Sequence, residues 1–523
     1  MRHLLLIALI SFALISCKNS PNRFDLLILN GKIYDSQRQS FYESNIGVIG
    51  DKIAAIGDLS HAEALRTIDA SGHIVSPGFI DVHAHIESIM RLPQAESFVK
   101  QGVTTVLAGP DGRGPSNMAE FLNRLDGFDL GINTAWLIGH NSLRRAVMGS
   151  VNREPSSEEL QKMISLIDHA MDHGAYGIST GLKYVPGAYS KVDEVIALSR
   201  AASNKGGIYT SHLREEGLGL IDGVKEAIVI SREANIPVVL THHKAIGRPM
   251  WGASVQTLAM VDSARALGLD IMMDQYPYTA SATGLSVLIP AWARAGGYEE
   301  FVKRVEDPET RKKIHAEIMY NIEYDRGGND LEVVQFANVE WKPDLNGRTL
   351  KDWVLERGLE PTFANGADLV IEGQLNGGAS CVYHAIFEED VQRIMQHPLA
   401  MVASDGGLVE PGVGHPHPRS YGTFPRVLGH YVREKEVLSL ELALRKMTSL
   451  PAERLGLKDR GILKEGMKAD ITIFNPETVK DLGTFGAPHQ YPAGIPYVLV
   501  NGEITVDQGK LTEKRGGLVL RKN

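Results

Sequence analysis

Short apolar segments alternate with amphipathic segments through the middle of the chain. Eight of them are bounded by polar or turn-forming residues, as is typical of buried strands, and they cover residues 79–85, 104–108, 134–139, 176–180, 208–212, 238–242, 270–274 and 400–405. Apolar residues at helical spacing lie between most of these segments, for example over 157–173 and 219–234. Regular alternation of strands and helices favours an α/β protein with a parallel sheet, here closed into a (β/α)₈ TIM-like barrel.

Strand-like segments also occur near both ends of the chain. They cover 24–30, 46–49 and 52–56 at the start, and 470–474 and 497–500 at the end. The first is followed by Asn30-Gly31, a pair typical of a tight turn between strands. We therefore expect both ends to form one small β-sandwich domain over 24–76 and 462–523. The barrel would span 77–461, with an insertion at about 281–370 over its catalytic face.

The first 17 residues have a different character. A positively charged start is followed by an apolar run over 4–15, which is too short to span a bilayer comfortably and is typical of a secretory signal peptide. The small residue Ser16 directly before Cys17 resembles a bacterial lipobox. We predict a lipoprotein signal peptide over 1–17, acylation of Cys17, and an exported protein anchored to a bacterial membrane, in the periplasm or at the cell surface. An ordinary signal peptide is the alternative.

Charge and cysteine content restrict the partners and the chemistry. The net charge is −9, from 54 basic and 63 acidic residues, and there is no long basic run. This argues against nucleic-acid binding. Cys381 is the only cysteine besides Cys17, so no intramolecular disulfide is expected after export, and its apolar surroundings predict a buried thiol. The sequence does not indicate an oligomeric state.

Side chains that bind metals recur at the ends of the predicted strands. His83 and His85 are two residues apart, so both imidazoles lie on one side of a strand. His212, His242 and Asp405 end the fifth, sixth and eighth predicted strands. The carboxyl ends of barrel strands meet on one face, where active sites lie. The pattern therefore predicts a cage for one or two zinc ions.

Long motifs carry a resemblance to a known family. They are PGFIDVHAH at 77–85, GAYGISTGLKYVPG at 174–187, SHLR at 211–214, THHK at 241–244, DQYPY at 274–278, VASDG at 402–406 and HPRSYGTF at 417–424. The first resembles the first-strand motif of the amidohydrolase superfamily. Together they resemble the D-aminoacylase (N-acyl-D-amino-acid deacylase) family from about residue 25 to the end. The resemblance implies a zinc-dependent enzyme that hydrolyses N-acyl-D-amino acids to a carboxylate and a free D-amino acid.

The resemblance also implies roles for individual residues. His83 and His85 would bind one zinc ion, and His212 and His242 the other. Asp405 would act as general base and then general acid on a metal-activated water. The substrate, a small N-acyl amino acid, would be held through its carboxylate by Tyr184, Lys244, Tyr276 and Arg419. The preference for the D configuration comes from the resemblance alone.

One departure from the family concerns a metal ligand. Characterised D-aminoacylases carry a cysteine ligand in a Gly-Asn-Cys-Gly turn after the second strand, whereas residues 109–112 here are Gly-Pro-Asp-Gly. Asp111 could replace the cysteine through its carboxylate. Alternatively, Lys183 could be carboxylated and bridge two ions, as a lysine at that strand end does in other amidohydrolases. A protonated lysine has no lone pair to donate, so the modification would be essential. Of the two, we favour Lys183.

Other functions remain open at this point. A dipeptidase of the isoaspartyl type, or a cyclic amidase resembling hydantoinase or dihydroorotase, would use a similar site. A ligand-binding surface lipoprotein without activity is an alternative from another class. The four histidines and Asp405 argue against it, because binding alone does not require a metal and a base.

Overall fold

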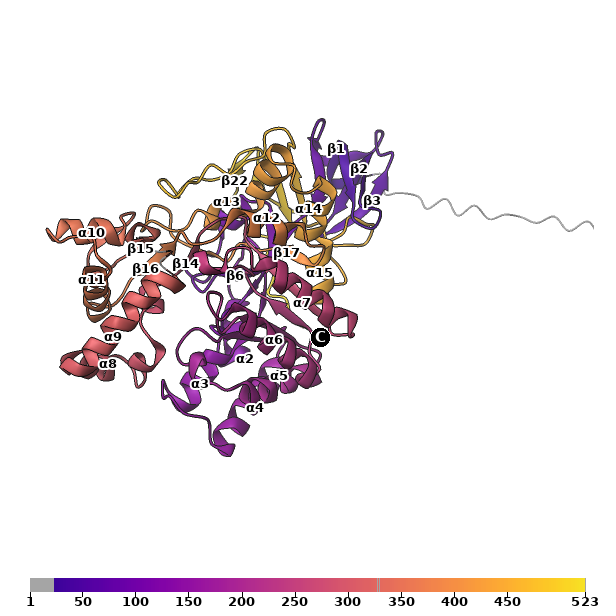
Figure 1. Cartoon of the computed structure of the whole chain (residues 1–523). Helices are drawn as coiled ribbons and strands as arrows, with labels where there is room; N and C mark the ends of the chain where they lie inside the picture. Colours follow the sequence, from indigo (N-terminus) through magenta and orange to yellow (C-terminus); the bar gives the residue numbers. More distant parts are fainter. Residues whose placement is uncertain (1–22, 327, 329, 523) are drawn as a thin grey trace, which may run out of the picture.

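The computed structural model describes residues 23–326, 328 and 330–522 (Figure 1). The predicted signal peptide and Cys17 lie outside the described residues. None of the helices within the described residues combines the length and apolar character that a bilayer-spanning segment requires.

Two parallel sheets form the centre of the protein, and each of the eight predicted strands overlaps at least one observed strand. One sheet has the order β18-β6-β7-β8, and the other has the order β17-β13-β12-β11-β10-β9. The strands are β6 (Phe79–His85), β7 (Val103–Ala108), β8 (Asn133–Trp136), β9 (Ile138–Gly139), β10 (Gly177–Gly181), β11 (Ile208–His212), β12 (Val238–Leu240), β13 (Ile271–Gln275), β17 (Ala400–Val402) and β18 (Gly406–Gly407). All pairs within these two sheets are parallel.

Helices separate most of these strands along the chain. They are α1 (Glu96–Val99), α2 (Met118–Leu125), α3 (His140–Met148), α4 (Ser157–Asp172), α5 (Val192–Asn204), α6 (Leu220–Ala234), α7 (Ser254–Ala266), α12 (Glu388–Gln396), α13 (Arg419–Arg426), α14 (Leu440–Met447) and α15 (Ser449–Leu455). Helix α4 begins where predicted because Ser156 and Glu159 form a capping box.

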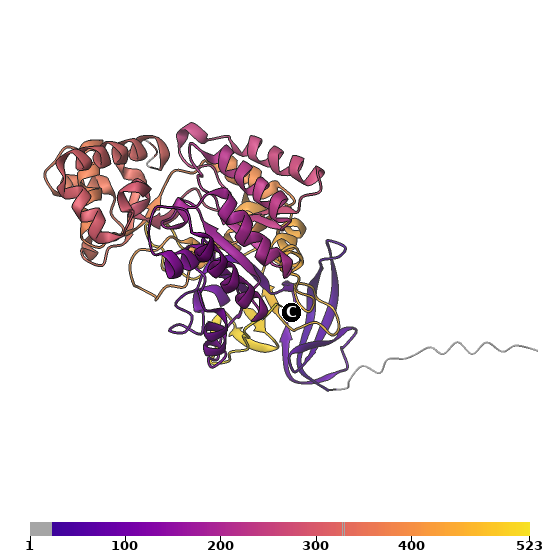
Figure 2. The ribbon, with the colours of Figure 1, turned by 90° about the horizontal axis from the view of Figure 1, so that it is seen from below.

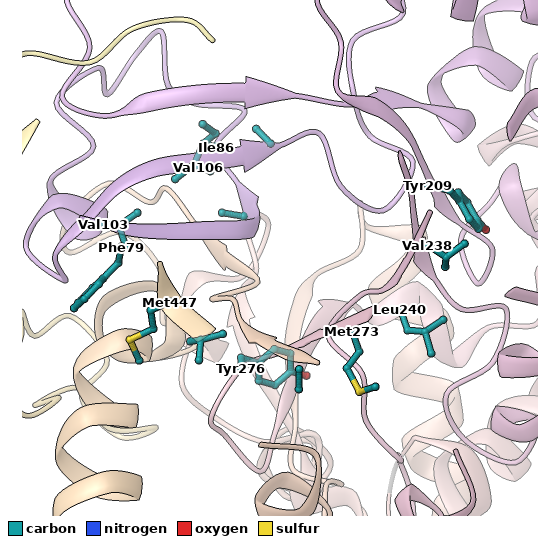
Figure 3. Close-up of a cluster of buried hydrophobic side chains, with 14 of the residues drawn as sticks. Phe79, Ile86, Val103, Val106, Tyr209, Val238, Leu240, Met273, Tyr276 and Met447 are labelled. Atoms are coloured by element: carbon teal, nitrogen blue, oxygen red, sulfur yellow. The ribbon is translucent and has the colours of Figure 1, made fainter. Parts of the chain in front are cut away.

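Both faces of the parallel sheets are buried, which explains the continuous apolar segments in the sequence. In β12, Val238 and Leu240 belong to the large cluster shown in Figure 3, whereas Val239 between them belongs to another cluster. Phe79 and Met273 join the large cluster from the two different sheets. Full burial of one such side chain contributes about 1.5–3 kcal/mol. The packed strands therefore form a rigid support for the residues at their ends.

The two ends of the chain contribute to a single nine-stranded sheet. Its main path is β22-β21-β20-β19-β5-β1-β2-β3, and β4 also pairs with β1. The strands are β1 (Arg23–Asp35), β2 (Ser40–Ile49), β3 (Lys52–Gly57), β4 (Glu63–Asp69), β5 (Ile74–Pro77), β19 (Ile471–Phe474), β20 (Tyr497–Val500), β21 (Glu503–Asp507) and β22 (Lys510–Leu511). The antiparallel pair β5–β19 joins the two ends directly before β6 begins.

The segment between β13 and β17 forms a separate packed unit. Strands β14 (Ser281–Gly284), β15 (Val334–Asn338) and β16 (Ser380–Tyr383) form a three-stranded sheet with β16 in the centre, next to helices α8 (Tyr298–Glu306), α9 (Pro308–Tyr320), α10 (Leu350–Glu356) and α11 (Phe363–Leu375). These elements share their own apolar cluster, which includes Phe336 and Trp353. Figures 1 and 2 place the four helices at the opposite end of the molecule from β1–β3. The central strand β16 follows residue 370, so this unit continues beyond the insertion boundaries expected from the sequence.

Candidate metal centre

The histidines predicted as ligands meet at the carboxyl ends of the parallel strands. His83 and His85 lie in β6, and His212 is the last residue of β11. His242 and Asp405 do not end strands as expected, because β12 stops at Leu240 and β17 at Val402. Both residues have left-handed backbone conformations, with φ of 37° and 48°. Such sparsely populated backbone conformations often occur at functional sites.

Asp111 lies between the two histidine pairs. Its Oδ1 is 3.6 Å from His83 Nε2 and 3.4 Å from His242 Nε2. Its Oδ2 is 3.5 Å from His85 Nε2 and 3.8 Å from His212 Nδ1. The turn after β7 holds Asp111 in a left-handed conformation with φ of 53°. Asp111 therefore belongs to two overlapping groups of metal-binding side chains, one with His83, His85 and Asp405 and one with His212 and His242.

Lys183 has other partners. Its Nζ is 2.8 and 2.7 Å from the two carboxylate oxygens of Glu215 and 3.3 Å from Asp325 Oδ2. The side chain follows β10 and forms ion pairs with Glu215 in the loop after β11 and with Asp325 from the segment between β13 and β17. Contrary to our preference from the sequence, the geometry favours Asp111 over Lys183 as the replacement for the cysteine.

Asp405 faces the histidines with one oxygen and an arginine with the other. Its Oδ1 is 3.5 Å from His83 Nε2 and 3.3 Å from His85 Nε2. Its Oδ2 is 2.9 Å from Arg419 NH1. Burial opposes ionisation, yet the Arg419 guanidinium and the neighbouring imidazoles hold the pKa of Asp405 well below its usual range. Asp405 is therefore an ionised carboxylate whose Oδ1 faces the two imidazoles while its Oδ2 is paired with Arg419.

The side chains in this centre fit a divalent cation. His83 Nε2 and Asp111 Oδ1, which face each other across the centre, are buried without a hydrogen-bond partner among the described residues. Leaving such a group unsatisfied costs about 1–3 kcal/mol. Burial disfavours a charge on His83, but Asp111 and Asp405 outweigh it and raise its pKa to about 10, which shows that the carboxylates attract positive charge here. Imidazole nitrogens and carboxylate oxygens are ligands that zinc accepts.

Two buried aspartates beneath the centre escaped the sequence analysis. Asp81 Oδ1 accepts hydrogen bonds from the N–H groups of His83 and Ser404, at 3.1 and 3.0 Å, and burial raises its pKa to about 7. Asp274 Oδ1 accepts a 2.6 Å hydrogen bond from the N–H of His242. These contacts fix the backbone that carries the candidate ligands. The sequence did contain a signal for them, an aspartate among the apolar residues of a predicted buried strand. Because aspartate is rarely buried unless it is paired, such a residue indicates a specific polar contact.

Glu216 and Arg326 were also missed. Glu216 lies in the loop after β11 and is 2% exposed, and Arg326 comes from the unit between β13 and β17 and is 1% exposed. Their nearest atoms, Arg326 NH1 and Glu216 Oε2, are 3.4 Å apart. Nothing in the sequence distinguishes Glu216, which points inward, from Glu215 beside it.

A cavity of about 460 Å³ opens onto the centre. Its lining includes His85, Asp111, Asp405, Tyr184 and Arg419 from the ends of the parallel strands and the segments after them, and Thr283, Asn338 and Cys381 from the three-stranded sheet. The unit between β13 and β17 therefore forms one wall of the cavity.

The residues predicted to hold the substrate take different positions around this cavity. The Tyr184 ring centroid is 4.4 Å from that of His212. The guanidinium of Arg419 lies over the Tyr276 ring at 4.6 Å, and the buried Tyr276 hydroxyl has no hydrogen-bond partner among the described residues. Lys244 Nζ donates a hydrogen bond to Glu216 Oε1 at 2.5 Å. Tyr184 and Arg419 thus line the cavity directly, whereas Lys244 is held by a buried carboxylate.

Known proteins resemble this chain over nearly its whole length. Residues 66–506 match a family described as the amidohydrolase family. The D-aminoacylase of Alcaligenes xylosoxydans xylosoxydans is 36% identical, over 95% of this chain and 98% of that protein. The structure of N-acyl-D-glutamate deacylase from Bordetella bronchiseptica, complexed with zinc and a phosphonate inhibitor, is 33% identical with a TM-score of 0.82, over 96% of this chain and 100% of that one. A D-aminoacylase structure with a binuclear metal centre is 34% identical with a TM-score of 0.81, over 95% and 100%.

The geometry makes a prediction about Asp111 and Lys183. Asp111→Ala should weaken zinc binding by at least about 10-fold. Loss of a residue that only hydrogen-bonds to a metal ligand already has an effect of about this size, and a ligand itself should matter at least as much. Lys183→Met should bind zinc as the wild type does, with or without bicarbonate. Metal analysis and competition with a chelator measure both. Normal zinc affinity in Asp111→Ala together with loss in Lys183→Met would reverse the assignment.

Proposed function

The chain belongs to the amidohydrolase family, and from that premise we propose that it is a zinc-dependent deacylase of N-acyl-D-amino acids. The convergence of four histidines, Asp111 and Asp405 on one centre, onto which a cavity opens, carries the proposal. Relatives that match nearly the whole chain are a D-aminoacylase and an N-acyl-D-glutamate deacylase, the latter solved with zinc. The products would be a carboxylate and a free D-amino acid.

We propose that the two parallel sheets form one closed (β/α)₈ barrel. Only Leu137 separates β8 from β9, and only residues 403–405 separate β17 from β18, which pairs with β6. The chain therefore passes from one sheet to the other at both edges. We also propose the domain division expected from the sequence, with a terminal β-sandwich over 24–76 and 462–523. The isolated bridge between Lys52 and Lys468, which brings the two chain ends together, supports the sandwich.

His83, His85, His212, His242 and Asp111 would hold one or two zinc ions. When bound, zinc lowers the pKa of a water molecule in contact with it from 15.7 to roughly 7 and polarises the scissile carbonyl. Asp405 would accept a proton from the attacking water at Oδ1, because Oδ2 is already bound to Arg419. The same oxygen would then donate the proton to the departing amine, which is a poor leaving group without it.

Tyr184, Lys244, Tyr276 and Arg419 would orient the substrate. Arg419 and Lys244 are cations that are 4% and 5% exposed, so both act at low dielectric, where attraction to a carboxylate is strong. The Tyr276 hydroxyl is buried and free to donate a hydrogen bond to the same group. Holding the carboxylate at this buried end would leave the acyl group towards the open cavity.

We further propose that the mature protein is exported and anchored to a bacterial membrane through lipid on Cys17. The support is the charged start, the apolar run over 4–15 and the small residue before the cysteine. The lipid chains of an acylated N-terminal cysteine supply the two signals that stable anchoring requires.

A substrate panel tests the proposed activity. Purified protein should hydrolyse N-acetyl-D-amino acids in preference to their L enantiomers, isoaspartyl dipeptides, hydantoins and dihydroorotate, with the free D-amino acid as the measured product. Chelation should abolish the activity and zinc should restore it. Turnover of only dipeptides or cyclic amides would assign a different hydrolase, and a protein without zinc or activity would be a binding lipoprotein.

The role of Asp405 predicts a large and selective loss of turnover. Asp405→Asn should lower kcat by about 10²–10⁴-fold, the usual contribution of a general acid–base residue. Zinc held by Asp111, His212 and His242 should remain, so metal content is measured in parallel. Glu410→Gln makes the same chemical change on an exposed residue that lines the cavity and should turn over normally. Turnover of Asp405→Asn near the wild-type rate would contradict the assignment.

Lipid attachment is tested in bacteria that express the full chain. Wild-type protein should take up a labelled fatty acid and sediment with membranes, whereas Cys17→Ser should remain unlabelled. Cys381→Ser is the matched control, because this thiol is buried and should not affect labelling. Unlabelled wild-type protein would favour an ordinary signal peptide.

A further inference from the structure

Glu216 contacts both histidines of one candidate metal group. Its Oε1 is 3.1 Å from His242 Nδ1, and its Oε2 is 3.5 Å from His212 Nε2. Each oxygen also faces one cation, because Lys244 Nζ is 2.5 Å from Oε1 and Arg326 NH1 is 3.4 Å from Oε2. One buried carboxylate thus joins two imidazoles and two positive charges.

Each of the two imidazoles lies between Glu216 and Asp111. The second nitrogen of His242, Nε2, is 3.4 Å from Asp111 Oδ1. The second nitrogen of His212, Nδ1, is 3.8 Å from Asp111 Oδ2. The nitrogens that face Asp111 are hydrogen-bonded to each other at 2.7 Å, whereas the opposite nitrogens face the two oxygens of Glu216. The two rings therefore present different atoms, Nε2 and Nδ1, to the same point.

This arrangement determines where the ring protons lie. A neutral imidazole has one N–H and one nitrogen lone pair, and an ionised carboxylate only accepts hydrogen bonds. A ring nitrogen that donates to Glu216 carries the proton, which leaves the lone pair on the nitrogen that faces Asp111. A metal ion binds that lone pair, and a hydrogen bond on the far nitrogen is the usual device that fixes a ligand histidine.

Lys244 opposes this placement of the proton on His242. Its Nζ is 2.8 Å from His242 Nδ1, and an ammonium group can only donate hydrogen bonds. On its own it would draw the lone pair to Nδ1 and leave the proton on Nε2, the nitrogen that faces Asp111. Lys244 also donates to Glu216 Oε1 and to the His242 carbonyl, at 2.5 and 2.8 Å, so Glu216 competes with His242 Nδ1 for the ammonium group.

We propose that Glu216 is a positioning residue that sets the tautomers of His212 and His242 and so directs one nitrogen of each towards a shared metal ion. The inference rests on the metal site of the proposed function, but it does not depend on which amide is cleaved. Arg326 adds a contribution from the unit between β13 and β17, because it faces the Glu216 oxygen that contacts His212.

Two substitutions distinguish a residue that positions the His212 and His242 rings from one that only neutralises the charges of Lys244 and Arg326. Glu216→Gln removes the negative charge and replaces one carboxylate oxygen with an NH₂ group, which donates hydrogen bonds instead of accepting them. Glu216→Asp keeps a charge for Lys244 and Arg326, so folding is preserved, but withdraws the oxygens from both rings by one methylene. Glu215→Gln is the matched control, since this adjacent carboxylate pairs with Lys183 instead.

The measurement is zinc affinity of the whole protein by competition with a chelator, together with the visible spectrum after loading with cobalt(II). Both Glu216 variants should bind zinc about 10–100-fold more weakly, as is usual when the hydrogen-bond partner of a ligand histidine is lost. Their cobalt(II) spectra should differ from that of the wild type, and Glu215→Gln should match the wild type in both measurements.

The outcomes separate the inference from the proposed function. Folded Glu216→Asp with wild-type zinc affinity and an unchanged cobalt spectrum would overturn the inference, whatever Glu216→Gln does, and reduce Glu216 to a counter-ion. Weaker binding in Glu216→Asp supports it. Wild-type protein that binds zinc without hydrolysing N-acyl-D-amino acids would contradict the proposed substrate and leave the Glu216 comparison valid.

Discussion

Asp111 contacts four imidazoles through its two oxygens, at 3.4–3.8 Å, at the bottom of a cavity between two structural units. Burying so many polar atoms away from water is costly unless each finds a partner. His83 Nε2 and Asp111 Oδ1 have none among the described residues, and nitrogen and oxygen atoms of these types are ligands that a divalent cation such as zinc accepts. The need to hold a cation therefore explains why the surrounding strands bring these residues together.

Buried acidic side chains lie behind the histidines. Asp81 and Asp274 accept hydrogen bonds from the backbone N–H groups of His83 and His242, and Glu216 contacts the rings of His212 and His242. These acidic residues lie on rigid elements or next to them, so the geometry of the centre is preorganised. Arg326 extends the network to the unit that forms one wall of the cavity. Metal binding and the shape of the cavity thus depend on shared contacts.

Much of the fold followed from periodicity. Residues 157–173 and 219–234 were expected as helices, and α4 and α6 cover 157–172 and 220–234. Irregular and short elements were harder to predict. The strand β16 has only four residues, yet it is the central strand of its sheet. Its position depends on pairing with strands that lie about 45 and 100 residues earlier, and local pattern does not contain that information.

By itself, the sequence determined the α/β alternation and placed His83, His85, His212, His242 and Asp405 at or near strand ends. These follow from spacing along the chain, because strand periodicity and the common direction of parallel strands are local properties. Only the tertiary structure favours Asp111 over Lys183, and only it separates Glu216 from Glu215. Both choices depend on which side chain turns inward from a loop, and that is set by contacts with residues remote in the sequence, among them His83, His242 and Asp325.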